Sequence, residues 1–295
     1  MVKVGVIING TARLGVKAKR ALDLIRNSPN NQAEFKTTKY RNHASDIAKE
    51  WASTKQVLVA VGGDGTCNEV LNGWHKANPR SGAIGIIPGG TGNDFLRMFE
   101  PFNAERFVCC LESLNVRSID YGIVTSQSGE KAFLNISDLG FGAKVVQLLD
   151  KQRKIGLKGA TSYYIAIIRA FFVYRKKSLT IELDGKRRSE KILLTAFCNG
   201  SYFGHGLAIH PGSSLINGKL GITIVGDVSL FTYLSKLKYL KKGERIDHPK
   251  VNYLTAEEIT FSDYDQSLKL EMDGELFEEP ELKITVAKQK LPLVC

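Results

Sequence analysis

Two glycine-rich turns carry the residues of this chain that could hold and transfer a phosphate. An apolar run at 57–61 leads into Gly62-Gly63-Asp64-Gly65-Thr66, and another at 82–88 leads into Gly89-Gly90-Thr91-Gly92-Asn93-Asp94. A buried strand, a glycine turn and a helix start together aim backbone N–H groups and the positive end of a helix dipole at one point. Either turn alone could be a plain tight turn, since short glycine motifs often occur by chance. Two of them after successive strands favour a phosphate site.

The first third of the chain alternates the elements that would position these turns. We expect strands at residues 2–8, 33–37, 57–61 and 82–88, and helices at 16–25, at 43–51, after a cap at Thr66 and near Phe95 after a cap at Asn93 or Asp94. Strands separated by helices form right-handed crossovers and a parallel sheet. Ligands bind outside the carboxyl ends of such strands, so both glycine turns and a first turn at Asn9 would share one crevice.

From about residue 116 the pattern changes to short strands separated by turns, which predicts an antiparallel β-sandwich. The expected strands are 116–124, 132–136, 179–183, 192–197, 220–225, 259–261, 268–272 and 282–286, with helices near 161–174 and 230–241. We place the boundary near Tyr121, which gives an α/β domain of residues 1–121 and a β-rich domain of residues 122–295. The last residues could pack back on the first domain. Because no linker rich in Pro, Gly or Ser separates the two, we expect the active site in the cleft between them.

The composition predicts a globular protein with a basic surface. The net charge is +11, and its positive side chains concentrate at 151–191 and 236–250. Nucleic acid and anionic membrane would both fit this charge, but no basic motif interleaved with aromatic residues is present, so we expect no nucleic-acid partner. Five cysteines without metal-ligand spacing indicate free thiols in a reducing cytosol. No signal peptide is recognisable, and the apolar stretch 163–174 is too short for a bilayer span of about 20 residues.

The two turns and their neighbours resemble the catalytic domain of the diacylglycerol kinase family, which includes bacterial soluble lipid kinases and, more distantly, sphingosine and ceramide kinases. The resemblance rests on residues 61–66 with Glu69 and Asn72-Gly73, on residues 88–95, and on later matches at Asp120 and at Asp273-Gly274-Glu275. It therefore extends over nearly the whole chain. It implies an NAD kinase/diacylglycerol kinase-like first domain that binds ATP and Mg²⁺, and a second domain that binds a lipid substrate.

The resemblance also implies which residues contact the nucleotide. They are Asn9, Thr11, Thr38, Gly62, Gly63, Asp64, Gly65, Thr66, Asn68, Glu69, Gly89, Gly90, Thr91, Gly92, Asn93 and Asp94. The first turn usually reads Asn-Pro-x-x-Gly in the family, so Asn9 and Thr11 fit the pattern, whereas Gly10, Ala12 and Arg13 depart from it.

Carboxylates are implied for both magnesium binding and proton transfer. Asp64, Asp94 and Asp120 would hold the catalytic Mg²⁺, directly or through water, because it prefers hard oxygen ligands. Asp273 and Glu275, two residues apart and so on one side of a strand, would include the base that accepts the hydroxyl proton. The sequence does not distinguish between them.

A second, structural metal site is implied within residues 211–222. The family carries acidic residues around an Asp-Gly pair there, whereas this chain has Asn217-Gly218, with Ser214 and Lys219 as the other candidate ligands. Asn217 offers an oxygen without a charge. We therefore expect this site to be weak or empty.

These features predict a kinase that transfers the γ-phosphate of ATP to a lipid hydroxyl, first of all that of diacylglycerol, giving phosphatidate. The enzyme would be cytoplasmic and peripheral at the inner membrane surface, held to anionic lipid by its basic second domain. Two alternatives remain open: an NAD kinase-like enzyme, which shares Gly-Gly-Asp-Gly-Thr, and a non-catalytic nucleotide or lipid sensor, which would explain the departures at Gly10 and Asn217. The identity of the lipid and the presence of a homodimer also remain open.

Overall fold

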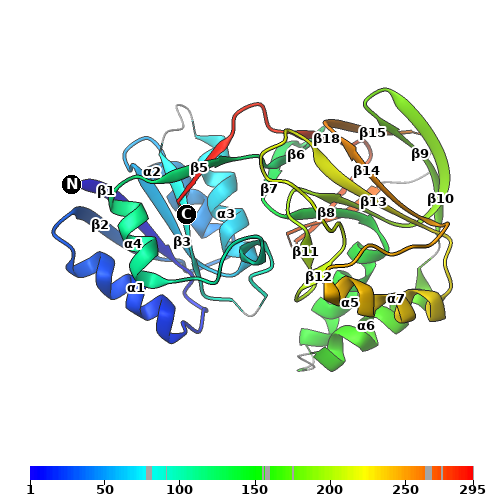
Figure 1. The fold of residues 1–295 in the computed structure, drawn as a ribbon, viewed down its shortest axis with the longest axis horizontal. Helices are drawn as coiled ribbons and strands as arrows, with labels where there is room; N and C mark the ends of the chain where they lie inside the picture. Colours follow the sequence, from blue (N-terminus) through cyan, green and yellow to red (C-terminus); the bar gives the residue numbers. More distant parts are fainter. Residues whose placement is uncertain are drawn as a thin grey trace.

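Two large sheets organise the chain, one in each half of the molecule (Figure 1). A computed structural model describes residues 1–77, 82–90, 92–154, 156, 160–174, 176–262, 268–273 and 275–294. Both ends of the chain lie in the first half, so the chain crosses to the second half and returns.

The first sheet has six strands in the order β2-β1-β3-β4-β19-β5, and β5 alone runs antiparallel to its neighbour. Its strands are β1 (Val2–Ile8), β2 (Asn31–Thr37), β3 (Val57–Gly62), β4 (Ala83–Pro88), β5 (Val116–Ile119) and β19 (Leu291–Val294). The central strand β3 is buried at every position because helices cover both faces of the sheet. Its parallel neighbours end at the same edge, which places their turns together.

Two pairs of helices cover these faces. On one face of the sheet, the β3 residue Val59 packs against α1 and α4. On the other face, Leu58 and Ala60 pack against α2 and α3. The helices are α1 (Val16–Asn27), α2 (His43–Trp51), α3 (Asp64–Lys76) and α4 (Ala104–Glu112), with a single 3-10 turn η1 (Phe95–Met98) after β4.

The second sheet has eleven strands. Its main path is β17-β16-β8-β10-β9-β15-β18-β6-β7, and β13 and β14 extend from β10. The strands are β6 (Gly122–Ser126), β7 (Gly129–Phe133), β8 (Ile136–Gly140), β9 (Lys177–Leu183), β10 (Lys186–Cys198), β13 (Leu220–Gly226), β14 (Val251–Ala256), β15 (Glu258–Ser262), β16 (Leu268–Met272), β17 (Glu275–Glu279) and β18 (Lys283–Val286). All its pairings are antiparallel, and the long strand β10 joins β9 to β8 and β13.

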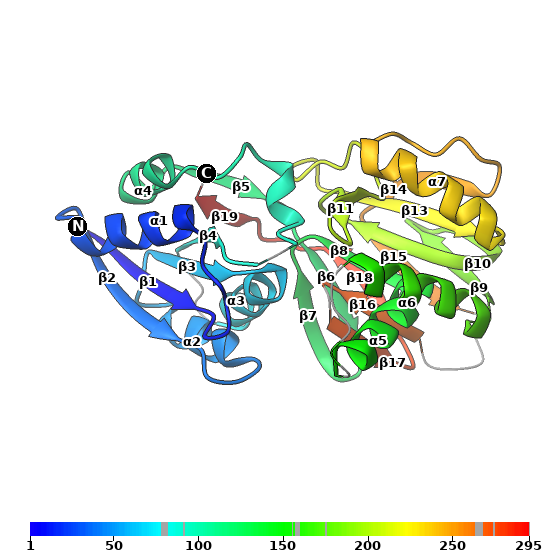
Figure 2. The same cartoon turned by 90° about the horizontal axis from the view of Figure 1, so that it is seen from below.

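Helices α5 (Phe141–Lys154), α6 (Ala160–Val173) and α7 (Leu230–Lys242) lie together on one side of this sheet (Figure 1 and Figure 2). Rings from each helix meet: Tyr233 of α7 lies 5.4 Å from both Phe141 of α5 and Phe171 of α6, centroid to centroid. A ribbon of β11 (Tyr202–Phe203) and β12 (Leu207–Ala208) lies between these helices and the first domain. After β18 the chain returns to the first sheet, where β19 pairs with β4 and β5.

The predicted fold class, a parallel α/β domain followed by an antiparallel β-sandwich-like domain, is confirmed. Several predicted elements are wrong in detail. The single strand expected over 116–124 is two strands, β5 and β6, in different sheets. Helix α3 begins at Asp64 after Gly63, so Thr66 lies inside the helix and does not cap it. Helix α5 was not predicted, and the element at Phe95 is a 3-10 turn without a side-chain cap.

Candidate active site

The turn before α3 and the turn after β4 pack against each other through the backbone of their glycine residues. We call residues 62–66 together with 89–94 the glycine cradle. A Cβ on Gly90 would lie 2.5 Å from the Gly63 Cα, and a Cβ on Gly62 would lie 2.4 Å from the Thr66 Oγ1, so only glycine allows these approaches. Gly63 gives α3 no side-chain cap, which leaves the positive end of the helix open to an anion. The cradle therefore suits a phosphate group.

Asp64 and Asp94 hold the two turns of the cradle against each other. The Asp64 Oδ2 accepts a hydrogen bond from the Asp94 N–H at 3.2 Å. The Asp94 carboxylate accepts hydrogen bonds from Arg97 Nε at 3.1 Å and from the His205 N–H at 2.9 Å. A Cβ on Gly92 would lie 3.1 Å from Asp64 Oδ2 and 3.8 Å from Asp94 Oδ2, so one oxygen of each carboxylate faces the same space. Burial raises the pKa of Asp64, its hydrogen bond from the Asp94 N–H opposes this rise, and the charge of Asp94 adds to it.

The first turn is fastened to the cradle by its own polar side chains. The Asn9 Oδ1 accepts hydrogen bonds from the N–H and the Oγ1 of Thr11, at 2.9 and 2.8 Å, and its Nδ2 donates to Thr66 Oγ1 at 2.9 Å. The Thr38 Oγ1 accepts from the Gly10 N–H at 3.1 Å. Asn9 and Thr11 line the cavity described below, whereas Thr38 supports the turn from behind.

Asn68 and Glu69 make contacts within the protein. The Asn68 Nδ2 donates to the Asp273 Oδ2 at 2.9 Å, which connects α3 of the first domain with the second domain. The two Glu69 oxygens accept from the Asn42 and Ala44 N–H groups, at 2.9 and 3.1 Å, and so satisfy the N-terminus of α2. Glu69 also borders the cavity.

Asp273, at the end of β16, is held by four hydrogen bonds. Its Oδ1 accepts from the Asn135 and Ile136 N–H groups, both at 3.0 Å, and its Oδ2 accepts from the Leu134 N–H at 2.7 Å and from Asn68. An ionised carboxylate has about four acceptor sites, so all of them are used. Burial raises the pKa of Asp273 to about 6, although each of these hydrogen bonds lowers it.

Two predicted site positions fall outside the described part of the chain. These are Thr91 and the side chain of Glu275, whose backbone begins β17.

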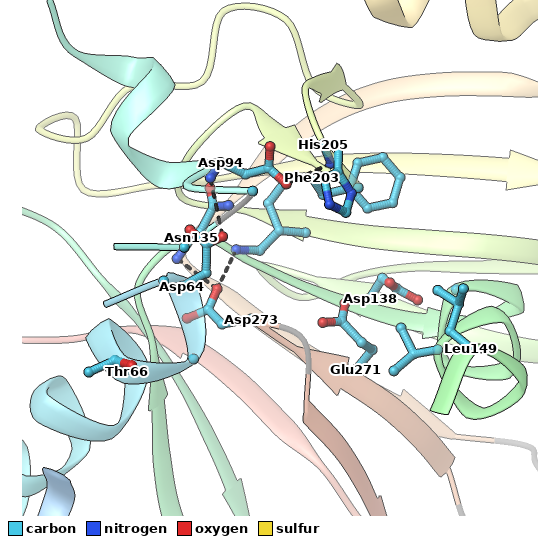
Figure 3. A pocket seen from close by; sticks show the side chains of 18 of the residues that line it. Asp64, Thr66, Asp94, Asn135, Asp138, Leu149, Phe203, His205, Glu271 and Asp273 are labelled. Carbon is cyan, nitrogen blue, oxygen red and sulfur yellow. Dashed lines mark hydrogen bonds between the residues drawn. The ribbon is translucent and has the colours of Figure 1, made fainter. Parts of the chain in front are cut away.

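One continuous cavity of about 930 Å³ joins the glycine cradle to the second domain (Figure 3). Asp64 and Asp273 lie at its first-domain end, and apolar side chains of α5, among them Leu149, line its far end. Two carboxyl groups that the sequence interpretation missed, Asp138 and Glu271, lie between these regions. No local pattern singles them out, because Glu271 alternates with the exposed Lys269 in β16 and Asp138 lies in the short segment Ile136–Gly140, and only the pairing of β8 with β16 brings them together.

Comparison with known families assigns both halves of this arrangement. The diacylglycerol kinase catalytic domain matches residues 3–124, and the YegS C-terminal NAD kinase beta sandwich-like domain matches residues 136–295. The chain belongs to the diacylglycerol kinase family. Its fold and family make it a lipid kinase of the diacylglycerol kinase type.

Individual members of the diacylglycerol kinase family agree with this assignment. A diacylglycerol kinase of Staphylococcus saprophyticus is 28% identical over 243 residues, which cover 82% of this chain and 77% of the relative. A diacylglycerol kinase of Bacillus subtilis is 28% identical over 235 residues, covering 79% and 75%. The crystal structure of a diacylglycerol kinase from Bacillus anthracis has the same fold, with a TM-score of 0.71 at 20% identity over 99% of this chain and 96% of that one.

In this member of the diacylglycerol kinase family, Asp120 lies apart from the cavity that Asp64 and Asp94 border. Its side chain is 2% exposed and pairs with the Lys290 Nζ at 2.9 Å through Oδ1, while Oδ2 accepts from the Gly218 N–H at 2.8 Å. The Lys290 ammonium also donates to the Ile216 carbonyl at 3.0 Å. The Lys290 ammonium group therefore lies between the Asp120 carboxylate and the Ile216 carbonyl. This position is next to the turn at Asn217-Gly218, where the sequence suggested a structural metal site.

The predicted ligands of that second metal stabilise the turn instead. The Ser214 Oγ accepts from the Ile216 N–H at 3.4 Å, the Asn217 Oδ1 accepts from the Lys219 N–H at 3.0 Å, and the Lys219 Nζ lies 3.8 Å from the Glu257 carboxylate. Within the described residues, no group of three or more His, Cys, Asp or Glu side chains could hold a metal ion. The donor set around Asn217 does not fit magnesium, because its one buried carboxylate is already neutralised by Lys290.

Replacing Lys290 by methionine should lower the free energy of unfolding by about 1–3 kcal/mol, because the buried Asp120 carboxylate then loses its counter-charge. The measurement is chemical denaturation with and without millimolar magnesium. Magnesium should restore part of the loss in Lys290→Met, since an oxygen site has been vacated. Lys288→Met, which alters an exposed lysine on the same segment, is the control. Equal stability of Lys290→Met and the parent would contradict the role given to this ion pair.

Proposed function

We propose that this lipid kinase transfers the γ-phosphate of ATP to the hydroxyl of a lipid, and that diacylglycerol is the first acceptor to test. The observation that carries the proposal is the single cavity that joins the glycine cradle and Asp273 to an apolar end between β8, α5 and α7. A phosphate donor and a lipid acceptor can therefore approach each other from opposite ends. A sensor would need only one of these ends.

Nucleotide phosphates would bind at the cradle, where backbone N–H groups at the start of α3 face the cavity. Asp64 and Asp94 fit a magnesium ion, directly or through water, because one oxygen of each faces the space beside Gly92. Magnesium supplies neutralisation of the charge on the transferred phosphoryl group when it is bound. The proposal gives Asp120 no part in this site, since its carboxylate is paired with Lys290.

Asp273 and Glu275 remain the candidates for the base. To take a proton, Asp273 would have to give up one of its four hydrogen bonds, and this favours a role in positioning residues 134–136 beside α3. Glu275 would then accept the proton of the lipid hydroxyl. Either assignment requires Asp273 to be ionised, because a protonated carboxyl group cannot accept all four bonds.

The second domain would meet an anionic membrane surface through α6 and α7. Phe172 is 80% exposed at the end of α6, and Phe231 is 83% exposed at the start of α7. The Lys241 Nζ donates to the Tyr164 OH at 2.9 Å, so the lysine-rich end of α7 lies against the start of α6. Exposed aromatic side chains at one end of the α6 and α7 pair, and lysines at its other end, fit the boundary between acyl chains and anionic headgroups. None of the helices in the described part of the chain is long and apolar enough to cross a bilayer. The proposed location is therefore the inner membrane surface, reached from the cytoplasm.

Labelled γ-phosphate from ATP with magnesium should appear in lipid when the parent is incubated with a panel of acceptors in mixed micelles. Asp64→Asn should reduce kcat by about 100-fold or more, because it removes a carboxylate from the phosphoryl-transfer site. Asp273→Asn and Glu275→Gln, measured side by side, separate the positioning role from the base. Labelled NADP formed from added NAD would instead support the NAD kinase alternative, and ATP binding without any product would support a sensor.

The pH dependence of the rate should follow the ionisation of Asp273. Its pKa is raised from 3.8 to about 6, so the carboxylate is lost as the pH falls through 6 and kcat/KM should fall with it. Above that pH the rate should level off. Because burial also raises the pKa of Asp138 to about 6, the profile is measured in Asp138→Asn as well, where the acidic limb should persist. A rate that stays constant down to pH 5 would contradict a raised pKa at Asp273.

Binding to vesicles that contain anionic phospholipid should weaken when the exposed aromatic residues of α6 and α7 become polar. Phe172→Ser with Phe231→Ser should reduce vesicle co-sedimentation about 10-fold or more, given about 25 cal/mol per Å² of apolar surface withdrawn from water. High salt should reduce binding of the parent further, because the lysines are screened. The control is Tyr40→Ser, which removes an exposed aromatic side chain from the first domain. Phe261 cannot serve as the control, because it packs against Phe197 in the sheet. Unchanged co-sedimentation of the double variant would exclude this surface.

A further inference from the structure

Asp138 and Glu271 face each other across two paired strands. They are direct partners in the antiparallel pairing of β8 with β16, and they are 1% and 7% exposed. Like charges directly opposite each other in a sheet are destabilising, and buried carboxylates are more so. The start of α5 accounts for part of the Asp138 carboxylate, because the Ala143 N–H bonds to it and a Cβ on Gly142 would lie 2.2 Å from both of its oxygens. We call Asp138 and Glu271 the acid pair.

Burial disfavours the charged form of Asp138 in the acid pair. Burial raises the pKa of Asp138 to about 6, while a hydrogen bond with Glu271 and, more weakly, the Ala143 N–H lower it. Burial also raises the pKa of Tyr174 to about 12, and the negative charge of Asp138 adds to that rise.

One oxygen of the acid pair has no partner in the protein. The Asp138 Oδ1 is buried and accepts no hydrogen bond from any described residue. Both carboxyl groups border the cavity, and Leu149 of α5 lies beside them on its apolar side (Figure 3). The Asp138 Oδ1 is thus a buried acceptor without a partner among the described residues, on a residue that borders a ligand cavity, and a donor from a ligand would satisfy it.

The acid pair lies next to Asp273, on the side toward the apolar end of the cavity (Figure 3). Asp138 is two residues beyond Ile136 on β8, and Glu271 is two residues before Asp273, which follows the end of β16. Successive positions on one face of a strand are about 7 Å apart. With a hydrogen bond at each end, a short acceptor headgroup spans this distance.

We propose that the acid pair binds a second hydrogen-bond donor of the lipid acceptor, a hydroxyl or an amino group two or three carbon atoms from the hydroxyl that receives the phosphate. This inference rests on the proposed transfer of phosphate to a lipid. Diacylglycerol has only ester oxygens near its free hydroxyl, and these accept hydrogen bonds but donate none. Such a lipid would leave the Asp138 charge unpaired, so acceptors with a free amine or a second hydroxyl are preferred. An amine also supplies the positive charge that balances the pair.

The test compares three short-chain lipids of matched length: a diacylglycerol, a monoacylglycerol with a second hydroxyl, and a sphingoid base with an amine. The full-length parent, Asp138→Asn, Glu271→Gln and the exposed control Asp184→Asn are each studied by calorimetric binding below the critical micelle concentration, and by phosphate transfer. The parent should bind the two donor-bearing lipids more tightly than diacylglycerol. Asp138→Asn should weaken those two by about 10-fold or more and leave diacylglycerol unchanged, the size expected for one charge-assisted hydrogen bond. A stronger effect on the sphingoid base identifies the amine as the group bound, and equal effects identify a hydroxyl.

Binding and transfer separate the two proposals. If the parent binds all three lipids equally, or if Asp138→Asn weakens all three alike, the acid pair has no part in selecting the acceptor and the inference fails. If binding discriminates as expected but no lipid is phosphorylated, the proposed kinase function fails while the acid pair stands. A change in thermal stability of Asp138→Asn with the same binding preferences as the parent would reveal a purely structural pair and would also overturn the inference.

Discussion

The hydrogen bonds around the Asp273 carboxylate hold the two halves of the active site in one geometry. Three come from successive backbone N–H groups, at residues 134–136 of the second domain, and the fourth comes from Asn68 on α3 of the first. A buried carboxylate that lost even one of them would be left with an unpaired charge, so the strand ends and the helix must keep their positions together. Asp64, which belongs to the glycine cradle, lies one turn before Asn68 on α3. Asn68 therefore restrains movement of the cradle relative to the lipid end of the cavity, together with Asn72, which bonds to Ala132, and the His205 N–H, which bonds to Asp94.

Close backbone approach is the second constraint, and it follows from the same arrangement. The two glycine turns touch at Gly63 and Gly90, where a single added methyl group would overlap backbone atoms. Backbone N–H groups can then face the cavity without side chains between them and a ligand. Asp64, which starts α3, thereby acquires its hydrogen bond from Asp94 on the other turn. The local sequence thus determines both the shape and the charge of the nucleotide end.

The strands and glycine turns at this end of the molecule could be predicted because their signals are local. An apolar run of β-branched residues, a glycine turn and a helix start follow one another within about fifteen residues, and each constrains its neighbours. The acid pair was missed because it depends on the register of β8 against β16, which joins segments far apart in the chain. Asp120 was assigned to magnesium on the basis of resemblance, and its partner Lys290 follows the last strand of the second sheet. Helix α5 was not predicted because it interrupts a region of short strands. Its stability depends on tertiary packing, in which Phe141 contacts Phe171 of α6 and Tyr233 of α7.

The buried carboxylates of this chain divide according to what balances them. Asp120 has Lys290, and Asp273 has three backbone N–H groups and an amide, so the protein alone accounts for both. Asp138 is different, because one of its oxygens is unpaired within the described residues and lies beside a cavity. Burial of an unbalanced charge is costly, and a fold that keeps one gains by completing it with a ligand. Along this cavity the balanced Asp273 fixes the framework, and the unbalanced Asp138 lies toward the end where we propose that the acceptor enters. Selection of the acceptor is thus a matter of charge as well as of apolar fit.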